Sequence, residues 1–74
     1  MFDRITFELQ VMSRRACIRG MRITVSLVTN LVANGMSTEE ILREYPALEA
    51  EDIKQALQYV AFLVDEEIHP LIIH

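Results

Sequence analysis

The chain has 74 residues, of which 51% are hydrophobic, and a net charge of −4. This length allows one domain, and so apolar a composition excludes a disordered chain. The single cysteine, Cys17, excludes an internal disulfide, so we expect packing, self-association or a partner to stabilise so small a fold.

The cellular location follows from the cysteine and from the apolar segments. A lone cysteine is typical of a reducing cytoplasm, and no apolar segment follows the first residues as it would in a signal peptide. The longest apolar run, from Tyr59 to Val64, is too short to span a bilayer. We therefore expect a cytoplasmic protein that does not enter the membrane.

The charges are divided unevenly along the chain. Residues 1–22 contain five arginines and two acids, whereas residues 23–74 contain two basic and nine acidic residues. A basic arm on an acidic body can bind an anion at one end and a basic partner at the other. Charged faces that only promote solubility would have the same composition.

The N-terminal part has the pattern of β-structure. Ile5, Phe7 and Leu9 alternate with polar residues, which predicts a half-buried strand, and residues 10–15 look like a loop. A β-hairpin is predicted over residues 16–25.

The hairpin register depends on its turn. Glycine in first position fits a two-residue type II′ turn at Gly20-Met21. This register separates an apolar face from the remaining residues, and a slip by one residue would mix the two faces. The expected pairs are Arg19 with Arg22, Ile18 with Ile23, Cys17 with Thr24, and Ala16 with Val25.

Two helices are predicted after the hairpin. The first starts after Ser26, a residue suited to the N-cap, and ends at Gly35, where a left-handed residue is favoured. The second starts with the capping box of Ser37 and Glu40 and ends near Tyr45, before a proline.

A third helix is predicted from Glu49 or Ala50 to about Glu67. Its buried stripe is expected to comprise Ile53, Ala56, Leu57, Val60 and Val64. Other apolar side chains lie outside this stripe, so the helix is apolar on more than one side, which favours contact with a second chain.

The last seven residues, 68–74, form an apolar tail. This tail could add a strand to a sheet edge, or it could be a disordered end. Together the tail and the third helix predict a partner or dimer surface that comprises Tyr59, Phe62, Leu63, Leu71 and Ile72. The chain is thus expected to be a single domain over residues 1–74, with a β arm at 1–25, three helices at 26–67 and the tail.

The arginines of the arm form the clearest candidate site. Arg19 opposite Arg22 would place like charges across the hairpin, which destabilises it unless an anion lies between them. Arg14 and Arg15 are close in sequence, so these four residues predict an anion-binding or nucleic-acid-binding site. The anion could be DNA phosphate, a partner's carboxylate or a carboxylate of the chain's own helices.

The third helix is a poor candidate for reading DNA. The recognition helix of a helix-turn-helix contacts DNA with its N-terminal residues, and here that segment contains three acids that would repel phosphates. Only Lys54, Gln55 and Gln58 could read bases. The arginine-rich arm is the better candidate for a DNA contact.

Catalytic chemistry has little support in the sequence. The two histidines, His69 and His74, are weak evidence for a metal site, and Cys17 is better explained as a small strand residue. We expect no enzyme, no catalytic residue, no metal, no cofactor and no small-molecule substrate.

Three blocks of the sequence resemble one family. They run from Cys17 to Val25, from Asn34 to Leu48 and from Glu51 to Leu57, and their Ile-Arg-Gly-Met-Arg-Ile and Tyr-Pro-Ala-Leu segments are the most distinctive. Over about residues 5–64 the chain resembles the domain of unknown function 433, whose members are small and antitoxin-like. The resemblance implies a short β region followed by a helix-turn-helix-like part.

The resemblance also implies a partner. It places the chain in a type II toxin–antitoxin pair, beside a PIN-like ribonuclease toxin. One segment departs from the family, which usually has a Gly-Gly-Lys-Pro-like stretch before the hairpin where this chain has Ser13-Arg14-Arg15-Ala16. Serine and arginine resist the positive φ angles that glycine allows, so this loop is expected to differ in shape.

The sequence therefore predicts an α+β fold, mainly α. It consists of a short N-terminal strand and a β-hairpin, followed by a three-helix bundle of the homeodomain or winged-helix type. The predicted function is that of an antitoxin-like protein, a homodimer or higher oligomer that binds a partner toxin and its own promoter DNA. The alternative is a protein-interaction or oligomerisation module without a nucleic-acid role.

Overall fold

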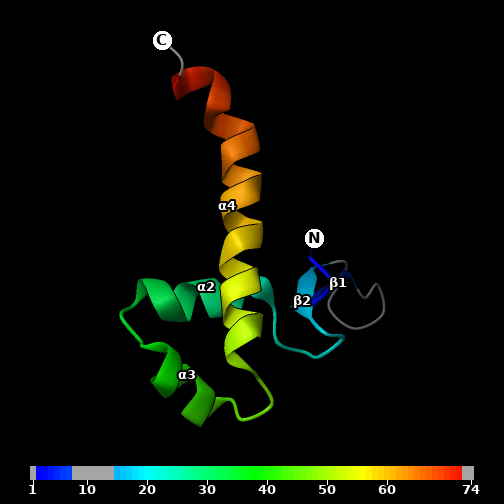
Figure 1. Cartoon of the computed structure of the whole chain (residues 1–74), viewed down its shortest axis with the longest axis vertical. Helices are drawn as coiled ribbons and strands as arrows, with labels where there is room; N and C mark the ends of the chain where they lie inside the picture. Colours follow the sequence, from blue (N-terminus) through cyan, green and yellow to red (C-terminus); the bar gives the residue numbers. More distant parts are fainter. Residues whose placement is uncertain (1, 8–14, 73–74) are drawn as a thin grey trace.

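The computed structural model describes residues 2–7 and 15–72, with side chains as far as residue 65. These residues form strands β1 (Ile5–Phe7) and β2 (Ala16–Ile18) and helices α2 (Val25–Ala33), α3 (Thr38–Glu44) and α4 (Ala50–Ile72). The lower half of α4 lies between the two strands on one side and the two shorter helices on the other (Figure 1). The fold is α+β and mainly α, as predicted.

The two strands form a small antiparallel sheet in which Ile5 lies opposite Ile18. Thr24 makes a single bridge to Cys17 on the other edge of β2, and the Ile18 N–H donates to the Ile23 carbonyl at 2.9 Å. These contacts confirm the predicted register at Cys17 and Ile18. The hairpin is shorter than predicted, because Val25 already belongs to α2 instead of pairing with Ala16.

The predicted type II′ turn at Gly20-Met21 is wrong. The turn lies one residue earlier, where the Met21 N–H donates to the Ile18 carbonyl at 2.8 Å and both intervening residues, Arg19 and Gly20, have positive φ angles of 45° and 73°. Arg19 is therefore a turn residue and does not pair with Arg22 across a ladder. Cys17 and Thr24, on the face opposite Ile18 and Ile23, are buried as well.

Part of the predicted β arm lies outside the described residues. The first predicted strand is present over Ile5–Phe7. Leu9 and residues 10–14 of the predicted loop fall outside the described part of the chain, so the expected difference in loop shape stays a prediction.

The ends of α2 and α3 are set by local hydrogen bonds. The N-cap of α2 is Thr24 and not Ser26, because the Thr24 hydroxyl accepts from the Leu27 N–H at 3.0 Å. Helix α2 ends as predicted before Gly35, whose φ of +94° allows the backbone to turn back on the last carbonyls. Helix α3 begins with the predicted capping box of Ser37 and Glu40.

Helix α4 is longer than predicted. It continues past Glu67 to Ile72, so residues 68–72 are helical and do not form a strand or an irregular tail. At 1.5 Å per residue the helix is about 34 Å long.

The core lies where the lower half of α4 meets the other elements. Ile53 and Ala56 are buried as predicted, whereas Leu57 and Val60 are partly buried and Val64 is exposed. The residues of the core cluster come from every described element and from the turn before α4. They are Ile5, Ile18, Val25, Val28, Ile41, Leu48, Ile53 and Ala56.

Candidate interaction surfaces

A buried carboxylate joins the β arm to α4. The Asp52 side chain is fully buried in the first turn of α4. Arg4 Nη1 donates to its Oδ1 at 2.8 Å, and Arg19 approaches it side-on, with Nε at 3.0 Å from Oδ1 and Nη2 at 2.8 Å from Oδ2. The Glu49 N–H donates to Oδ2 at 2.8 Å and thereby caps the helix. We call Arg4, Arg19 and Asp52 the arm clamp.

The electrostatics of the clamp favour the charged carboxylate. Burial raises the pKa of Asp52. The hydrogen bonds from Arg19 and Arg4 together lower the pKa by more than burial raises it, so the pKa is about 2. The pKa of Arg4 is raised above its ordinary value by hydrogen bonds to Glu49 and Asp52, and that of Arg19 is raised by Asp52. The clamp is thus fully ionised at neutral pH.

Further hydrogen bonds surround the clamp. Gln55, one turn along α4, accepts from the Arg4 backbone N–H at 2.6 Å and donates to Asp3 Oδ1 at 2.9 Å. At the other end of the arm, the Gly20 N–H donates to the Thr6 hydroxyl at 2.8 Å. The arm is therefore bonded to α4 at several points and has a defined position relative to the helices.

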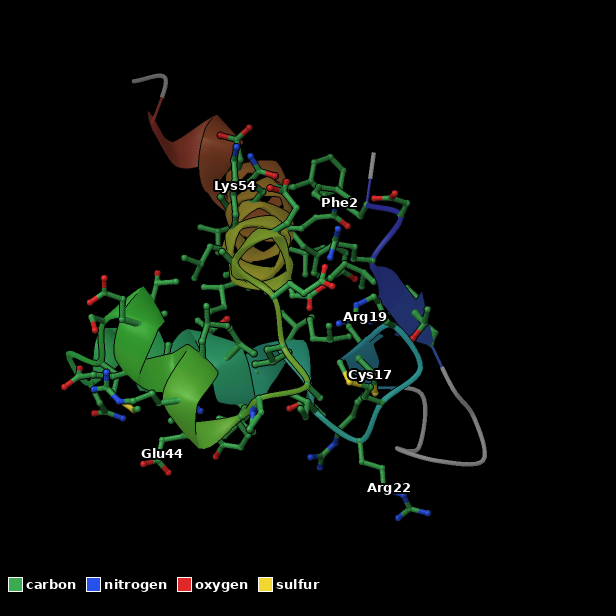
Figure 2. The ribbon with its side chains drawn as sticks, turned by 60° about the horizontal axis from the view of Figure 1, so that its bottom comes forward. Phe2, Cys17, Arg19, Arg22, Glu44 and Lys54 are labelled. Carbon is green, nitrogen blue, oxygen red and sulfur yellow. The ribbon has the colours of Figure 1, made fainter. Side chains whose placement is uncertain are left out.

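The clamp decides between the alternatives that the sequence left open for Arg19. Its anion is the chain's own Asp52, and Arg19 Nη2 also donates to the Ala47 carbonyl at 2.9 Å. Figure 2 shows Arg19 directed back toward α4, whereas Arg22 points away from the body of the molecule. The expected placement of an anion between Arg19 and Arg22 is therefore wrong.

The other predicted arginines are not part of the clamp. Arg15 and Arg22 are exposed, and neither forms an ion pair with any residue that the structure describes. Arg14 lies outside the described residues. Arg15 and Arg22 are thus the two described arginines of the arm with guanidinium groups available to an external anion.

Sequence reasoning missed the functional pairing of Arg4 with Asp52. In the sequence, Asp52 stands out only as one of the three acids at the start of the third helix, and Arg4 only as one of the five arginines of residues 1–22. The spacing of Glu49 and Asp52 does match a capping pattern, but no local pattern links residues that lie 48 positions apart. Gln55, considered as a base reader, is buried and bonded within the protein.

A second feature is the upper half of α4, which extends beyond the other described elements (Figure 1). The consecutive side chains of Phe62, Leu63 and Val64 are 49%, 43% and 46% exposed. Phe62 lies beside Phe2, with ring centroids 5.8 Å apart, and Tyr59 packs between Phe2 and Phe7. Of the predicted partner surface, Phe62 and Leu63 are thus exposed and Tyr59 is half-buried, while the side chains of Leu71 and Ile72 are not described.

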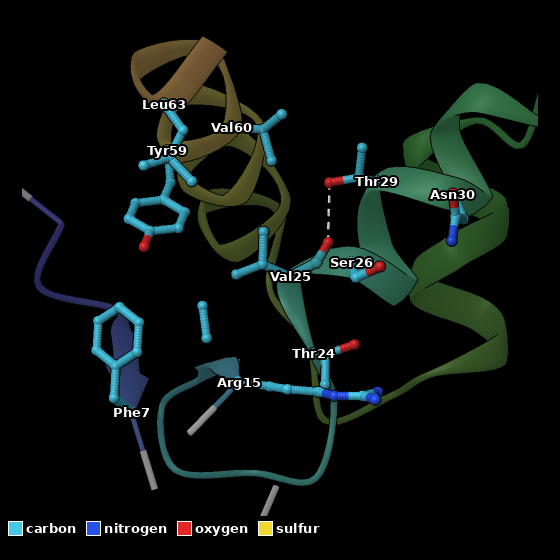
Figure 3. Close-up of a pocket in the computed structure, with 11 residues that line it drawn as sticks. Phe7, Arg15, Thr24, Val25, Ser26, Thr29, Asn30, Tyr59, Val60 and Leu63 are labelled. Carbon is cyan, nitrogen blue, oxygen red and sulfur yellow. Dashed lines mark hydrogen bonds between the residues drawn. The ribbon is translucent and has the colours of Figure 1, made fainter. Parts of the chain in front are cut away.

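An open groove of about 680 Å³ adjoins this half of α4. One wall comes from α4 and the β arm, where Phe7 faces Tyr59, and the opposite wall comes from the start of α2 (Figure 3). The lining is mainly apolar, and Arg15 is its one charged residue among those described. The lining residues are Phe7, Arg15, Ala16, Thr24, Val25, Ser26, Thr29, Asn30, Tyr59, Val60 and Leu63.

Side chains that could hold a metal ion do not cluster in the described part of the chain. No three histidine, cysteine, aspartate or glutamate side chains of that part come together in a way that could hold a metal ion. Cys17 is buried, and its thiol donates to the Arg15 carbonyl at 3.3 Å. The described helices include none with the length and apolar character that a membrane span requires.

The comparisons with known proteins agree with the resemblance seen in the sequence. The model of one family, described as a protein of unknown function (DUF433), matches residues 5–60. No curated protein and no solved structure gives a significant match. The matched region begins at β1, includes the arm clamp residues Arg19 and Asp52, and ends in the middle of α4. Because this match covers most of the 74 residues, the chain belongs to the DUF433 family.

Proposed function

We propose that this protein is an antitoxin-like component of a type II toxin–antitoxin pair, and that it binds its partner through α4. The observation that carries the proposal is the exposed apolar turn of Phe62, Leu63 and Val64 on the part of α4 that extends beyond the body. Adjacent apolar side chains on an unpaired helix are typical of a protein-binding surface. The partner, a PIN-like ribonuclease toxin, is proposed from the family resemblance.

The fold supports a binding role for this helix. The arm clamp and the core hold the lower half of α4 rigidly, so the upper half is presented in a fixed direction. Holding the helix in a fixed direction before binding reduces the conformational entropy that the complex has to overcome. The acidic character of residues 23–74 also suits a partner with a basic surface, such as an RNA-binding enzyme.

Co-expression with the product of the adjacent reading frame tests the proposal. We expect the two proteins to co-purify and the growth defect caused by the neighbour to be relieved. Phe62→Asp should weaken both effects, because it places a charge in the apolar surface, whereas Thr38→Asp adds the same charge at an exposed polar position of α3 and should not. A neighbour that neither associates nor is neutralised contradicts the proposal.

Binding to its own promoter DNA, which the sequence also predicts, would depend on Arg15 and Arg22. The use of Arg19 inside the clamp leaves a smaller basic surface than the sequence suggested, and this favours the second candidate, a protein-interaction module without a nucleic-acid role. Binding to promoter DNA distinguishes the two candidate functions. An antitoxin that regulates its own promoter binds that DNA, and a pure interaction module does not.

A further inference from the structure

We infer that the groove beside α4 receives the upper half of α4 from a second copy of this chain, with the two helices antiparallel. The inference rests on the proposed function, in which α4 is a docking helix. It assigns the groove side of α4 to a second copy of this chain. The groove and the exposed turn of α4 share Leu63, which lines the first and belongs to the second. In a two-fold dimer the same surface patch of each copy contacts that patch of the other copy. A residue that belongs both to the groove and to the inserted helix fits this arrangement.

The charges at the groove indicate which helix fits it. Its single charged lining residue among those described is Arg15, so the occupant should be an apolar helix with an acidic residue next to its apolar side chains. The chain's own α4 meets this requirement, since Asp65 directly follows Phe62, Leu63 and Val64, and two glutamates come next in the sequence. Within one chain, no described residue forms an ion pair with Arg15 or Asp65.

The antiparallel direction follows from the position of these charges along the helix. Arg15 lines the groove together with Tyr59, Val60 and Leu63 of α4. If two α4 helices cross at the level of Phe62 in opposite directions, Asp65 of one copy lies beside Tyr59 of the other, and Tyr59 lines the groove with Arg15. Asp65 of each copy then approaches Arg15 of the other. Parallel helices would instead place Asp65 beside Asp65.

The dimer would also cover apolar surface that is exposed in one chain. Phe7 is 58% exposed at the edge of the groove, and Leu63 and Val64 are nearly half exposed. All three lie on or beside the proposed contact, whereas Phe62 is directed toward Phe2. The side of α4 near Phe62 thus stays available to a different protein.

The oligomeric state of the full chain alone provides the first test. Light scattering over a concentration series should give twice the mass of one chain. Leu63→Asp should produce monomers at the same concentration, and Gln58→Asp should leave the dimer intact. A wild-type chain that stays monomeric, or a dimer that tolerates Leu63→Asp, overturns the inference.

A charge reversal tests the direction of the helices. Arg15→Asp and Asp65→Arg should each raise the dimer dissociation constant about tenfold, and the double variant should restore it to within about threefold. Arg22→Asp is the matched control, because Arg22 is an exposed arginine of the same arm outside the groove. Two single effects that merely add up in the double variant would overturn the antiparallel arrangement.

The outcome is separable from that of the proposed function. A chain that is monomeric alone but still co-purifies with the neighbouring gene product removes the dimer and retains the antitoxin-like role. In that case a Leu63-dependent complex identifies the neighbour as the occupant of the groove. A dimer that never binds the neighbour gives the opposite result.

Discussion

At the scale of single residues, Asp52 is the point where the arm and the helices meet. A buried carboxylate is costly unless its charge is neutralised and its oxygen atoms are hydrogen-bonded. Both oxygens of Asp52 meet this condition, since Oδ1 accepts from Arg4 and Arg19, and Oδ2 accepts from Arg19 and the Glu49 N–H. The same carboxylate therefore orients two arginines of the arm and caps α4.

Replacing this carboxylate should lower stability without changing the size of the side chain. Asp52→Asn removes the negative charge between Arg4 and Arg19, and we expect it to reduce the free energy of unfolding by about 2 kcal/mol. Urea denaturation at pH 7 measures the change. The control is Glu51→Gln, which removes a charge from the exposed neighbouring position and should change stability by less than about 0.5 kcal/mol. Equal effects of both substitutions would contradict a structural role for the clamp.

The stability contributed by Asp52 should depend on pH in one direction. Its pKa is lowered from 3.8 to about 2 in the folded protein, so the folded state binds this proton more weakly than the unfolded chain. The contribution is therefore present above about pH 4 and is lost as the pH falls toward 2. The difference in unfolding free energy between the wild type and Asp52→Asn should shrink over that interval. A difference that is the same at pH 6 and pH 2.5 would argue against this assignment.

At the scale of secondary structure elements, short local signals decide where the helices begin. Thr24 and Ser26 are both suitable N-cap residues, and only the backbone bridge between Cys17 and Thr24 places the former at the cap. We expect Thr24→Val, which keeps the shape and removes the acceptor of the Leu27 N–H, to lower stability by about 1 kcal/mol. Ser26→Ala is the control and should have little effect. Thermal unfolding compares the two, and the reverse order would contradict Thr24 as the cap.

The difference between local signals and long-range contacts explains how much of the fold could be predicted. The capping box at Ser37 and the glycine at 35 are local signals, so α3 and the end of α2 were placed correctly. The pairing of β1 with β2 and the clamp between Arg4 and Asp52 join residues far apart in sequence, and a single sequence contains no pattern that links them. The turn lies one residue earlier than the sequence predicts because a positive φ, expected at glycine, also occurs at Arg19.

At the scale of the whole molecule, the arginines of the β arm fall into two groups, one paired inside the protein and one exposed. Part of the positive charge of the arm is neutralised inside the protein, where Arg4 and Arg19 bind Asp52. The remaining described arginines of the arm, Arg15 and Arg22, are exposed, while the outer surface of α3 carries acids such as Glu44 (Figure 2). Internal ion pairs fix the arm to the body, and the exposed charges determine which partners approach each side.

This division of charge determines how DNA binding should be tested. Arg19→Ala is an unsuitable variant because it would also break the clamp, so the informative change is the double substitution Arg15→Ala and Arg22→Ala. If the arm contacts DNA phosphates, the double variant should bind promoter DNA more weakly and should lower the slope of log K against log salt by about 2 per chain. Arg43→Ala removes an exposed arginine on α3. It is the control and should leave the slope unchanged.

Fluorescence anisotropy from 50 to 200 mM salt measures both the affinity for DNA and the salt slope, because DNA affinity in this range is sensitive to phosphate contacts. An unchanged slope in the double variant would exclude the arm as the contact, and no binding at the lowest salt would favour an interaction module without a nucleic-acid role.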